Sequence, residues 1–402
     1  MSSTPPTQKT NLQIPMSSPD LTEAERRAVL EVLNTPTLSM GRRITDFEQS
    51  FCKLTGADHA IGVSSGTTGL HLCVRAAGIG PGDLVLTTPF SFVASANVML
   101  YERAIPVFVD VDPRTGNIDP ELLAAAAHDL ASGGKKAAKW LPRKGAESRR
   151  TLKALLPVDV FGQPADLEPI RGLADEMGLK MIEDACEALG AQYKGRPAGT
   201  FGDYAVFAFY PNKQITTGEG GVVITSDDAA AQMMRALRNQ GRAPGDTWLQ
   251  HTYLGYNYRM DEMSAALGAA QMGRLDELID KRDRVATWYT ERLSEIPGVQ
   301  PPVIEAFTTR MSWFVYVVRL DAKIDRQALA GRLETRGIPV RPYFLPIHLQ
   351  PYMVEAFGYR EGDFPVTEDL GRRGLALPFS GVMSEEQVEA VCAAIRDELT
   401  SA

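Results

Sequence analysis

Short apolar runs alternate with helix-length amphipathic stretches over the first 230 residues of the chain. Runs with the β-branched and aromatic composition of strands lie at residues 60–63, 84–87, 106–109, 154–158, 180–182, 204–209 and 221–225. Stretches with the apolar spacing of helices lie at residues 68–77, 93–103, 120–130 and 167–177. Because such alternation places helices on both faces of a sheet, the pattern predicts an α/β fold with a mostly parallel, buried sheet.

Local end signals predict further helices outside this alternating region. Thr22 and Glu25 have the spacing of a capping box, which predicts that a helix begins there. Residues 260–293 are rich in Ala, Leu and Met at helical spacing, so we expect long helices. A second capping box, Ser384 with Gln387, predicts the start of a final helix.

The pattern changes after residue 297. Residues 313–320 have the composition of a strand and residues 327–336 that of a helix. This change predicts a second, smaller α/β unit, because a chain of this length exceeds what one core usually accommodates. The expected parts are a flexible N-terminus at residues 1–12, a large domain at residues 13–294 and a small C-terminal domain at residues 295–402.

Composition narrows the classes of partner. The 402 residues are 44% apolar and 23% charged, and the net charge of −8 argues against nucleic acid or an anionic membrane as the main partner. No apolar run reaches the roughly 18 residues that span a bilayer, and the N-terminal segment lacks the pattern of a signal peptide. The four cysteines and five histidines are dispersed, so neither disulfides nor a metal site is expected. We expect a cytoplasmic protein in which residues 131–153, with eight Lys or Arg, form a solvated surface loop.

The segment FAFYPNKQITTGEGG, residues 207–221, places Lys213 between an apolar strand and a Gly-rich turn. Backbone that is rigid on both sides holds such an amine in place. An aldehyde cofactor needs a firmly placed primary amine that loses its proton readily, and lysine in a desolvated site has this property. The segment therefore predicts a cofactor-binding lysine, and an ordinary loop lysine is the alternative.

Two other segments carry complementary chemistry. MIEDACE, residues 181–187, places Asp184 at the carboxyl end of a buried strand, where a carboxylate can keep the ring nitrogen of a bound cofactor protonated. VSSGTTG, residues 63–69, lies between a strand and a helix, so its N–H groups and hydroxyls suit a phosphate. The alternatives are an acidic helix cap for the first segment and a plain small-residue turn for the second.

The order of phosphate turn, aromatic residue, aspartate and lysine resembles that of fold type I enzymes. These are the aspartate-aminotransferase-like enzymes that use pyridoxal 5'-phosphate (PLP). Within them the chain resembles the DegT family of nucleotide-sugar aminotransferases, especially perosamine-synthase-like members, from about residue 14 to the final helix apart from residues 131–153. The resemblance implies a large sheet domain with helices on both faces, a smaller α/β domain and a homodimer with shared active sites.

The resemblance also implies roles for individual residues. Lys213 would hold PLP covalently and move the proton between the substrate carbon and the cofactor. Asp184 would pair with the pyridine nitrogen. The other implied contacts are, for the phosphate, Ser65, Gly66, Thr67 and Thr68; for the ring, Phe92 in FSFVAS; and for the phosphate from the neighbouring subunit, Asn257 in GYNYRM.

Two positions depart from the family pattern. Many members have serine five residues before the lysine, where this chain has Ala208, so phosphate binding would depend more on the two threonines of the turn and on Asn257. Many members have glutamine three residues after the aspartate, where this chain has Glu187. A carboxylate beside the phenolic oxygen of PLP is stable only if one of the two carries a proton, so we expect a raised pKa for Glu187.

The substrate is indicated by resemblance alone. The ending GEGG, residues 218–221, looks like that of members that aminate C4 of a 4-keto-6-deoxy sugar, with glutamate as donor in a ping-pong reaction. The segment RPYFLPIH, residues 341–348, belongs to the part that closes over the substrate in such enzymes. Arg341 is a candidate for the glutamate carboxylate or the sugar diphosphate, and the candidates for the sugar pocket are Tyr343, His348 and Trp313. For each of them a surface ion pair or core packing is the alternative.

Other functions stay open. The same residues support amination of a 3-keto sugar, or of a keto-cyclitol in aminoglycoside biosynthesis. A PLP-dependent sugar dehydratase is disfavoured, because those members have histidine in place of the lysine. The alternatives from other classes are a PLP-binding regulator and a plain nucleotide-binding module, but the sequence has neither a DNA-binding appendage nor a GxGxxG turn after its first strand.

Overall fold

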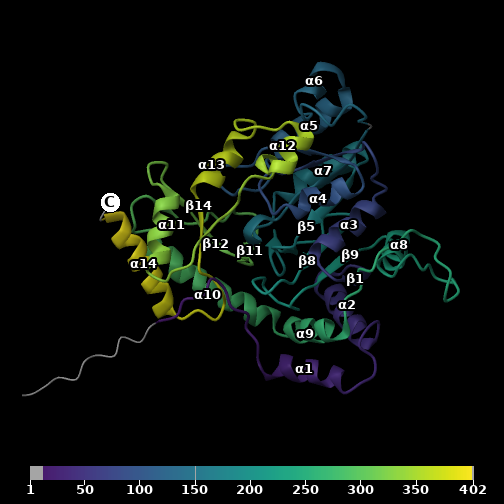
Figure 1. Cartoon of the computed structure of the whole chain (residues 1–402), viewed down its shortest axis with the longest axis horizontal. Helices are drawn as coiled ribbons and strands as arrows, with labels where there is room; N and C mark the ends of the chain where they lie inside the picture. The colour runs from purple at the N-terminus through teal and green to yellow at the C-terminus, as the bar shows by residue number, and fades with distance from the viewer. Residues whose placement is uncertain (1–11, 150, 401–402) are drawn as a thin grey trace, which may run out of the picture.

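Most of the chain forms a seven-stranded sheet and the helices that cover both of its faces (Figure 1). A four-stranded sheet lies at one end of this larger unit (Figure 1). The computed structural model describes residues 12–149 and 151–400. Of the N-terminal segment predicted to be flexible, residues 1–11 lie outside these ranges.

The large sheet joins its strands in the order β1-β9-β8-β5-β4-β2-β3. The strands from β8 to β3 pair in parallel, whereas β9 runs antiparallel between β1 and β8. The prediction of a mostly parallel sheet is confirmed, and each predicted strand is present at nearly the predicted bounds. These are β1 (His59–Val63), β2 (Leu84–Thr87), β3 (Ile105–Phe108), β4 (Leu152–Leu156), β5 (Lys180–Asp184), β8 (Tyr204–Ala208) and β9 (Gly221–Thr225).

Alternate side chains of these strands are buried against helices on opposite faces of the sheet. On one face Val85, Ile182 and Val206 pack with α3, α4 and α8. On the other, Phe207 and Ile224 pack with α2, α9 and α10, and the far strands pack with α5 and α7. The helices are α1 (Glu23–Leu33), α2 (Arg42–Thr55), α3 (Gly66–Ala76), α4 (Ala94–Tyr101), α5 (Pro120–Ser132), α6 (Gly134–Ala138), α7 (Leu167–Met177), α8 (Asp228–Arg238), α9 (Glu262–Met272) and α10 (Leu275–Leu293). Among helices of the described ranges, none combines the length and the apolar character needed to cross a bilayer.

Side-chain caps define the predicted helix starts. Thr22 and Glu25 make reciprocal hydrogen bonds at the start of α1. Ser384 and Gln387 do the same before α14 (Glu385–Thr400). The first N–H groups of a helix have no partner within the helix, so a local side chain that satisfies them sets where it begins. Both predicted helix starts are confirmed. They could be predicted from the sequence because a capping box depends only on residues that are near neighbours in the chain.

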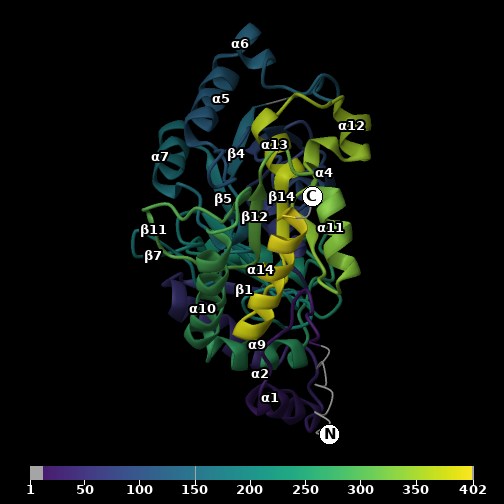
Figure 2. The same ribbon diagram turned by 90° about the vertical axis from the view of Figure 1, so that its left-hand side faces the viewer.

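The smaller sheet is antiparallel, in the order β10-β12-β14-β13. Helix α10 extends from α9 to α14 and connects the two units (Figure 2). The second half of α10 contributes Val285, Tyr289 and Leu293 to the core of the small sheet. Residues before 295 therefore take part in that core. The predicted boundary between residues 294 and 295 stays a prediction. The remaining elements are β6 (Gln192–Tyr193), β7 (Arg196–Pro197), β10 (Val299–Gln300), β11 (Thr308–Arg310), β12 (Tyr316–Leu320), β13 (Arg341–Pro342), β14 (Gly374–Leu377), α11 (Arg326–Thr335), α12 (Pro351–Phe357), α13 (Pro365–Arg373) and the short helices η1 (Val160–Gly162) and η2 (Ile347–Leu349).

The basic segment at residues 131–153 is more structured than the predicted loop. It includes the end of α5, all of α6 and the start of β4. Ala137 and Ala146 are buried, although the described lysines and arginines of the segment are exposed. The side chain of Trp140 donates to Asp129 at 2.9 Å and thereby fixes the segment on α5. A helix this short has no apolar periodicity, which is why the sequence pattern did not reveal it.

Phe51 tests the packing of α2 on the large sheet. The ring is fully buried, with its centre 5.2 Å from Phe47 and 5.4 Å from Phe207. We expect Phe51→Ala to lower the free energy of unfolding by about 3–5 kcal/mol, because it removes buried apolar area and leaves a cavity. Equilibrium urea unfolding followed by circular dichroism measures the loss. The control is Leu30→Ala on the exposed face of α1, expected to change stability by about 0.5 kcal/mol or less; equal losses in the two variants would contradict the packing.

Candidate active site

The parallel strands bring the predicted site segments to one edge of the large sheet. β5 ends at Asp184, β8 ends at Ala208, and the loop after β8 carries Lys213. β1 ends just before the turn that opens α3. Because β9 runs the other way, it begins at this same edge with Gly221. The segments therefore converge at the carboxyl edge, where open α/β sheets bind ligands.

The side chain of Lys213 is a largely buried amine held between two groups. It is 12% exposed, and its Nζ lies 3.7 Å from Oε1 of Glu187. On another side, the same nitrogen lies 3.7 Å from the centre of the Phe314 ring. The backbone N–H of Lys213 donates to the Tyr210 carbonyl at 2.9 Å and closes a tight turn. The amine is thus held by its own turn and by side chains from two other segments.

Asp184 is a buried carboxylate at the end of β5. Its Oδ2 accepts the hydroxyl of Ser95 at 2.7 Å, and its Oδ1 accepts the N–H of Cys186 at 3.2 Å. Ser95 was missed by the sequence reasoning, although it closes the FSFVAS motif that holds Phe92. The hydroxyl fixes the direction of the carboxylate, so the acid is set in one orientation before any ligand binds.

The turn before α3 is a helix N-terminus built from small residues. The Ser65 hydroxyl accepts the N–H of Thr68 at 3.2 Å, while the Thr68 hydroxyl accepts the N–H of Ser65 at 3.1 Å. A Cβ at Gly66 would lie 2.7 Å from the Cβ of Ala208, so the turn rests directly on the end of β8. The N–H groups of Gly66 and Thr67 have no partner within α3, and together with the helix dipole they suit an anion.

Glu187 is buried beside the amine. Its carboxylate accepts the N–H of Phe161 at 2.8 Å. Burial raises the pKa of the Glu187 carboxyl, and the charge of Lys213 opposes part of that rise. The sequence analysis predicted a raised pKa for Glu187 because of a neighbouring cofactor oxygen. The direction of that prediction is confirmed, but the main cause is the burial of the carboxyl within the protein. Two residues not predicted from the sequence fix its backbone: Gln214 Nε2 donates to the Glu187 carbonyl at 2.5 Å and to the Ser312 hydroxyl at 2.9 Å.

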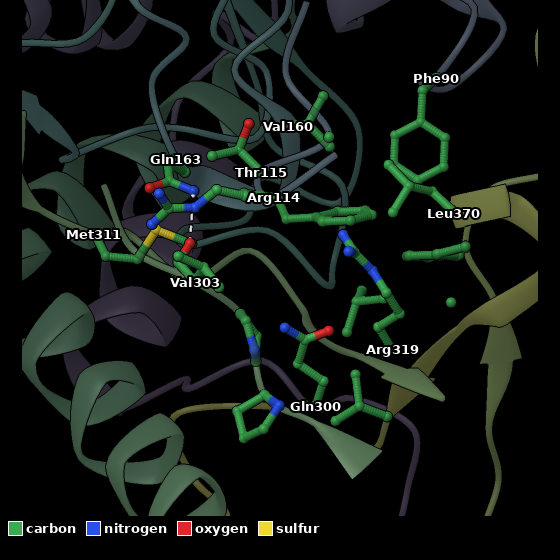
Figure 3. A pocket seen from close by; sticks show the side chains of 18 residues that line it. Phe90, Arg114, Thr115, Val160, Gln163, Gln300, Val303, Met311, Arg319 and Leu370 are labelled. Carbon is green, nitrogen blue, oxygen red and sulfur yellow. Dashed lines mark hydrogen bonds between the residues drawn. The ribbon is translucent and has the colours of Figure 1, made fainter. Parts of the chain in front are cut away.

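A cavity of about 60 Å³ lies next to this cluster, between the two sheets (Figure 3). Tyr343 lines it and stacks on Phe161 at 6.2 Å between ring centres. Burial, and then the charge of Glu187, raise the pKa of the Tyr343 hydroxyl. Tyr343 thus lies at the boundary between the cavity and the Lys213 cluster. Arg114 and Arg319 both line the cavity (Figure 3), although the guanidinium of Arg114 is also paired with Glu305 at 3.1 Å.

Phe92 and Asn257 lie at the surface of the chain. Phe92 comes just before α4, and Asn257 is in the loop between α8 and α9. The carbonyl of Tyr258 accepts the N–H of Ser64 at 2.9 Å, so the loop of Asn257 runs beside the start of the α3 turn. Both predicted residues are therefore accessible to a ligand or to a second chain.

His348 and Trp313 correct the sequence-based interpretation. His348 is fully buried, with its Nε2 3.1 Å from Oε1 of Glu368, and it packs among aromatic rings. Trp313 is also buried; its Nε1 donates to Asp283 at 2.9 Å and its ring stacks on Tyr316. The prediction that these two side chains line a sugar pocket is wrong, because each is enclosed by packed protein.

Arg341 lies on the edge strand β13 and is exposed. Its guanidinium lies 3.4 Å from Glu334, also exposed, and donates to the Val340 carbonyl at 2.8 Å. A surface ion pair of this kind contributes little stability. The guanidinium can therefore leave it for an anionic ligand at small cost.

Two buried carboxyl groups beneath the site were not predicted. Glu183 precedes Asp184 on β5, so it points to the opposite face of the sheet, where it accepts three backbone N–H groups. Asp159 follows β4, and one of its oxygens accepts the N–H of Ala165 at 2.9 Å. Burial raises the pKa of both groups, and for Asp159 the charge of Glu183 adds to the rise.

Comparison with known proteins identifies close relatives. The family described as the DegT/DnrJ/EryC1/StrS aminotransferase family matches residues 19–396. The GDP-perosamine synthase of Caulobacter vibrioides is 38% identical over 386 residues, which cover 95% of this chain and 97% of that protein. The spore coat polysaccharide biosynthesis protein SpsC of Bacillus subtilis is 35% identical over 403 residues, covering 97% and 98%. Among solved structures, the aminotransferase TlmJ from Streptoalloteichus hindustanus aligns with a TM-score of 0.85 at 32% identity, covering 97% of this chain and 99% of that one.

The raised pKa of Asp159 predicts a pH dependence of stability. In the unfolded chain its pKa is about 4, so the folded protein binds more protons between that value and the higher folded pKa. The free energy of unfolding therefore falls as pH rises through this interval. Asparagine does not titrate, so the stability of Asp159→Asn should improve relative to the natural protein as pH rises.

Urea titrations of the cofactor-free protein at a series of pH values above about 4 measure this difference. Asp175→Asn, at an exposed position on α7, is the control, for which we expect a difference that does not change with pH. A pH-independent difference for Asp159→Asn would show that its carboxyl is not held neutral by burial.

Proposed function

This chain belongs to the DegT/DnrJ/EryC1/StrS aminotransferase family, and on that premise we propose that it transfers the amino group of glutamate to C4 of a nucleotide-linked 4-keto-6-deoxy sugar. The family assignment confirms that the enzyme is a PLP-dependent aminotransferase with the aspartate-aminotransferase-like fold type I. As a sugar aminotransferase it acts on a keto sugar together with an amino donor. The aminated position, the donor and the roles of single residues belong to our proposal.

The residues at the carboxyl edge of the large sheet fit PLP. A Cβ at Gly221 would lie 2.7 Å from the backbone of Ser65, so glycine there keeps the α3 turn in place. The helix N-terminus that this leaves free suits the phosphate. Asp184, oriented by Ser95, is suited to keep a pyridine nitrogen protonated. Lys213 supplies the buried amine, and its position at the same edge as Asp184 is the observation that carries the proposal.

PLP, when bound, withdraws electrons from the carbon that carries the amino group. The chain supplies placement and proton transfer. We assign to Lys213 Nζ the transfer of the proton between the substrate carbon and the cofactor. The carboxyl of Glu187 lies 3.7 Å from that nitrogen, and the ring of Phe314 covers it on another side. Because the nitrogen is largely buried, water has little access to the reacting atoms.

Positive charge near the cavity supports an anionic, nucleotide-linked substrate. Arg114 and Arg319 line the cavity, and Arg341 is available at the surface. A planar guanidinium binds a phosphate or a carboxylate through paired hydrogen bonds. The GDP-perosamine synthase relative also supports a nucleotide-linked sugar. The GEGG ending of residues 218–221 favours C4, by its likeness to members that act there.

The loop between α8 and α9 supports a homodimer with shared sites. It projects from the body of the chain (Figure 1) and carries Trp248, Leu249 and Leu254, which are 77%, 83% and 83% exposed. Apolar side chains gathered in this way are typical of a protein–protein contact. Asn257 follows them on the same loop and is exposed. We propose that pairing of two chains brings it to the α3 turn of the partner, while its neighbour Tyr258 stays bonded to Ser64 of its own chain.

An acceptor screen tests the reaction. PLP-loaded enzyme with glutamate and a nucleotide-linked 4-keto-6-deoxy sugar should release 2-oxoglutarate and form the 4-amino sugar, followed by coupled assay and mass spectrometry. Lys213→Ala should lower kcat by roughly 10³-fold or more and abolish the borohydride-sensitive visible absorption. Lys53→Ala, at an exposed position on α2, should change neither.

The other acceptors decide between the remaining functions. Preference for a 3-keto sugar or a keto-cyclitol would contradict amination at C4. Preference for another amino acid over glutamate would contradict the donor. If no acceptor released 2-oxoglutarate, the proposed reaction would be wrong as a whole.

Mixed dimers test the role of Asn257 in the partner site. Lys213→Ala and Asn257→Ala each impair the sites of their own homodimers. In a mixed dimer, one site combines the natural Lys213 of one chain with the natural Asn257 of the other, if Asn257 acts across the interface. Refolded equimolar mixtures should then regain about one quarter of the natural activity. If the mixtures showed no more activity than the separate variants, Asn257 would not act across the interface. It would then contact the α3 turn of its own chain or have no part in phosphate binding.

A further inference from the structure

Arg282 is a buried cation that contacts backbone carbonyls rather than a carboxylate. It lies on α10 and is 4% exposed. Among the described residues, no Asp or Glu oxygen lies within 4.0 Å of its nitrogens. Burial lowers the pKa of its guanidinium to about 10. A buried charge without an opposite charge is costly, so the carbonyls around it must supply the compensation.

The guanidinium binds two separate segments. Nη1 donates to the carbonyls of Trp313 at 3.1 Å and Phe314 at 3.2 Å. Nη2 donates to the carbonyls of Asn212 at 3.1 Å and Lys213 at 2.5 Å. One planar group therefore joins the lysine turn after β8 to the segment that enters β12.

Both segments also meet at the tip of the lysine. The ring of Phe314 lies against Nζ of Lys213. The N–H of Phe314 donates to the Phe161 carbonyl at 3.1 Å, and the N–H of Phe161 donates to the carboxylate of Glu187. Glu187 in turn lies beside Nζ. The two segments that Arg282 joins thus contribute to both sides of the amine: the Phe314 ring lies on one side, and Glu187, held through Phe161, lies on the other.

We infer that Arg282 is a positioning residue for Lys213: it joins the two backbone segments that place the amine between the Phe314 ring and the Glu187 carboxyl. The inference rests on the proposed role of Lys213. A role in packing alone would be met by an apolar side chain without the desolvation cost of a buried charge. Lysine at this position would keep the charge, but its single ammonium cannot bridge four carbonyls as a planar fork does.

The test compares R282K with R326K. Arg326 is the matched control, because it also donates to backbone carbonyls, those of Gly371 and Gly374, and burial also lowers its pKa. Neither of its partners belongs to the Lys213 turn or to the segment before β12. Both substitutions conserve charge, so differences between the variants report geometry.

In the PLP-loaded enzyme, R282K should lower kcat by about 10- to 100-fold and leave the acceptor KM within about twofold. The pH midpoint of the visible absorption without substrate should also change, because the lysine nitrogen is no longer held between the Glu187 carboxyl and the Phe314 ring. R326K should leave both at the natural values.

The midpoint reads out the surroundings of the Lys213 nitrogen. Of the charged and titratable groups around it, Cys186 and Glu187 interact with the amine itself, Asp184 and Tyr343 interact with Glu187, and Arg282 contacts the backbone carbonyl of Lys213. R282K conserves the charge of all of them. A change in the midpoint therefore reports a displaced nitrogen and not a lost charge.

The thermal midpoint of the cofactor-free protein separates positioning from folding. If R282K only lowers this temperature and keeps the natural kcat and pH midpoint, Arg282 is structural and the inference is overturned. If R282K does not fold, Phe314→Leu tests the same arrangement, since it keeps the carbonyl that Arg282 binds and removes the ring over Nζ. It should lower kcat and shift the pH midpoint, and natural values for both would overturn the inference.

The failure of this inference differs from failure of the proposed function. If the visible absorption survives in Lys213→Ala, the role assigned to Lys213 is wrong whatever Arg282 does. If the absorption depends on Lys213 but R282K behaves like R326K, only the role of Arg282 is wrong.

Discussion

The parallel pairing of β5 with β8 is the constraint on which the active site depends. It ends both strands at one edge of the sheet, so Asp184 and the loop of Lys213 arrive side by side. The antiparallel β9 then begins at this edge with Gly221, close enough to Ser65 that no side chain fits between them. The turn of α3 can therefore lie next to the acid and the amine. The site depends on this close backbone packing as much as on its reactive groups.

Burial then determines how each charge of the cluster is satisfied. Glu187 accepts a hydrogen bond from the N–H of Phe161 and lies beside the amine of Lys213. Arg282 donates hydrogen bonds to four backbone carbonyls. In a desolvated cluster each polar group needs such partners, because an unpaired one costs free energy. The partners come from the large sheet and from the segment before β12. The reactive amine is thus fully held only when both sheets and α10 are in place, which links the small sheet to the chemistry of the large one.

The reactive residues could be predicted because a lysine and an aspartate each come shortly after an apolar run that reads as a buried strand. Lys213 and Asp184 each follow an apolar run, and the VSSGTTG turn lies between a strand and a helix. Ser95 and Gln214 were not predictable, since each acts through one hydrogen bond to a segment far away in sequence. The raised pKa of Glu187 was predicted from a neighbouring cofactor oxygen. Burial raises it in the protein itself, and no spacing along the chain specifies that burial.

The sequence by itself determined the order of strands and helices, the capped starts of α1 and α14, and the strand-end positions of the acid and the amine. These features depend on apolar periodicity and on hydrogen bonds between near neighbours, which are present in the sequence. Only the tertiary structure decided the reversal of β9, the enclosure of His348 and Trp313 in packed protein, and the binding of Arg282 to the lysine turn. Burial and long-range hydrogen bonds depend on which distant segments meet, and that is settled when the sheets and helices pack.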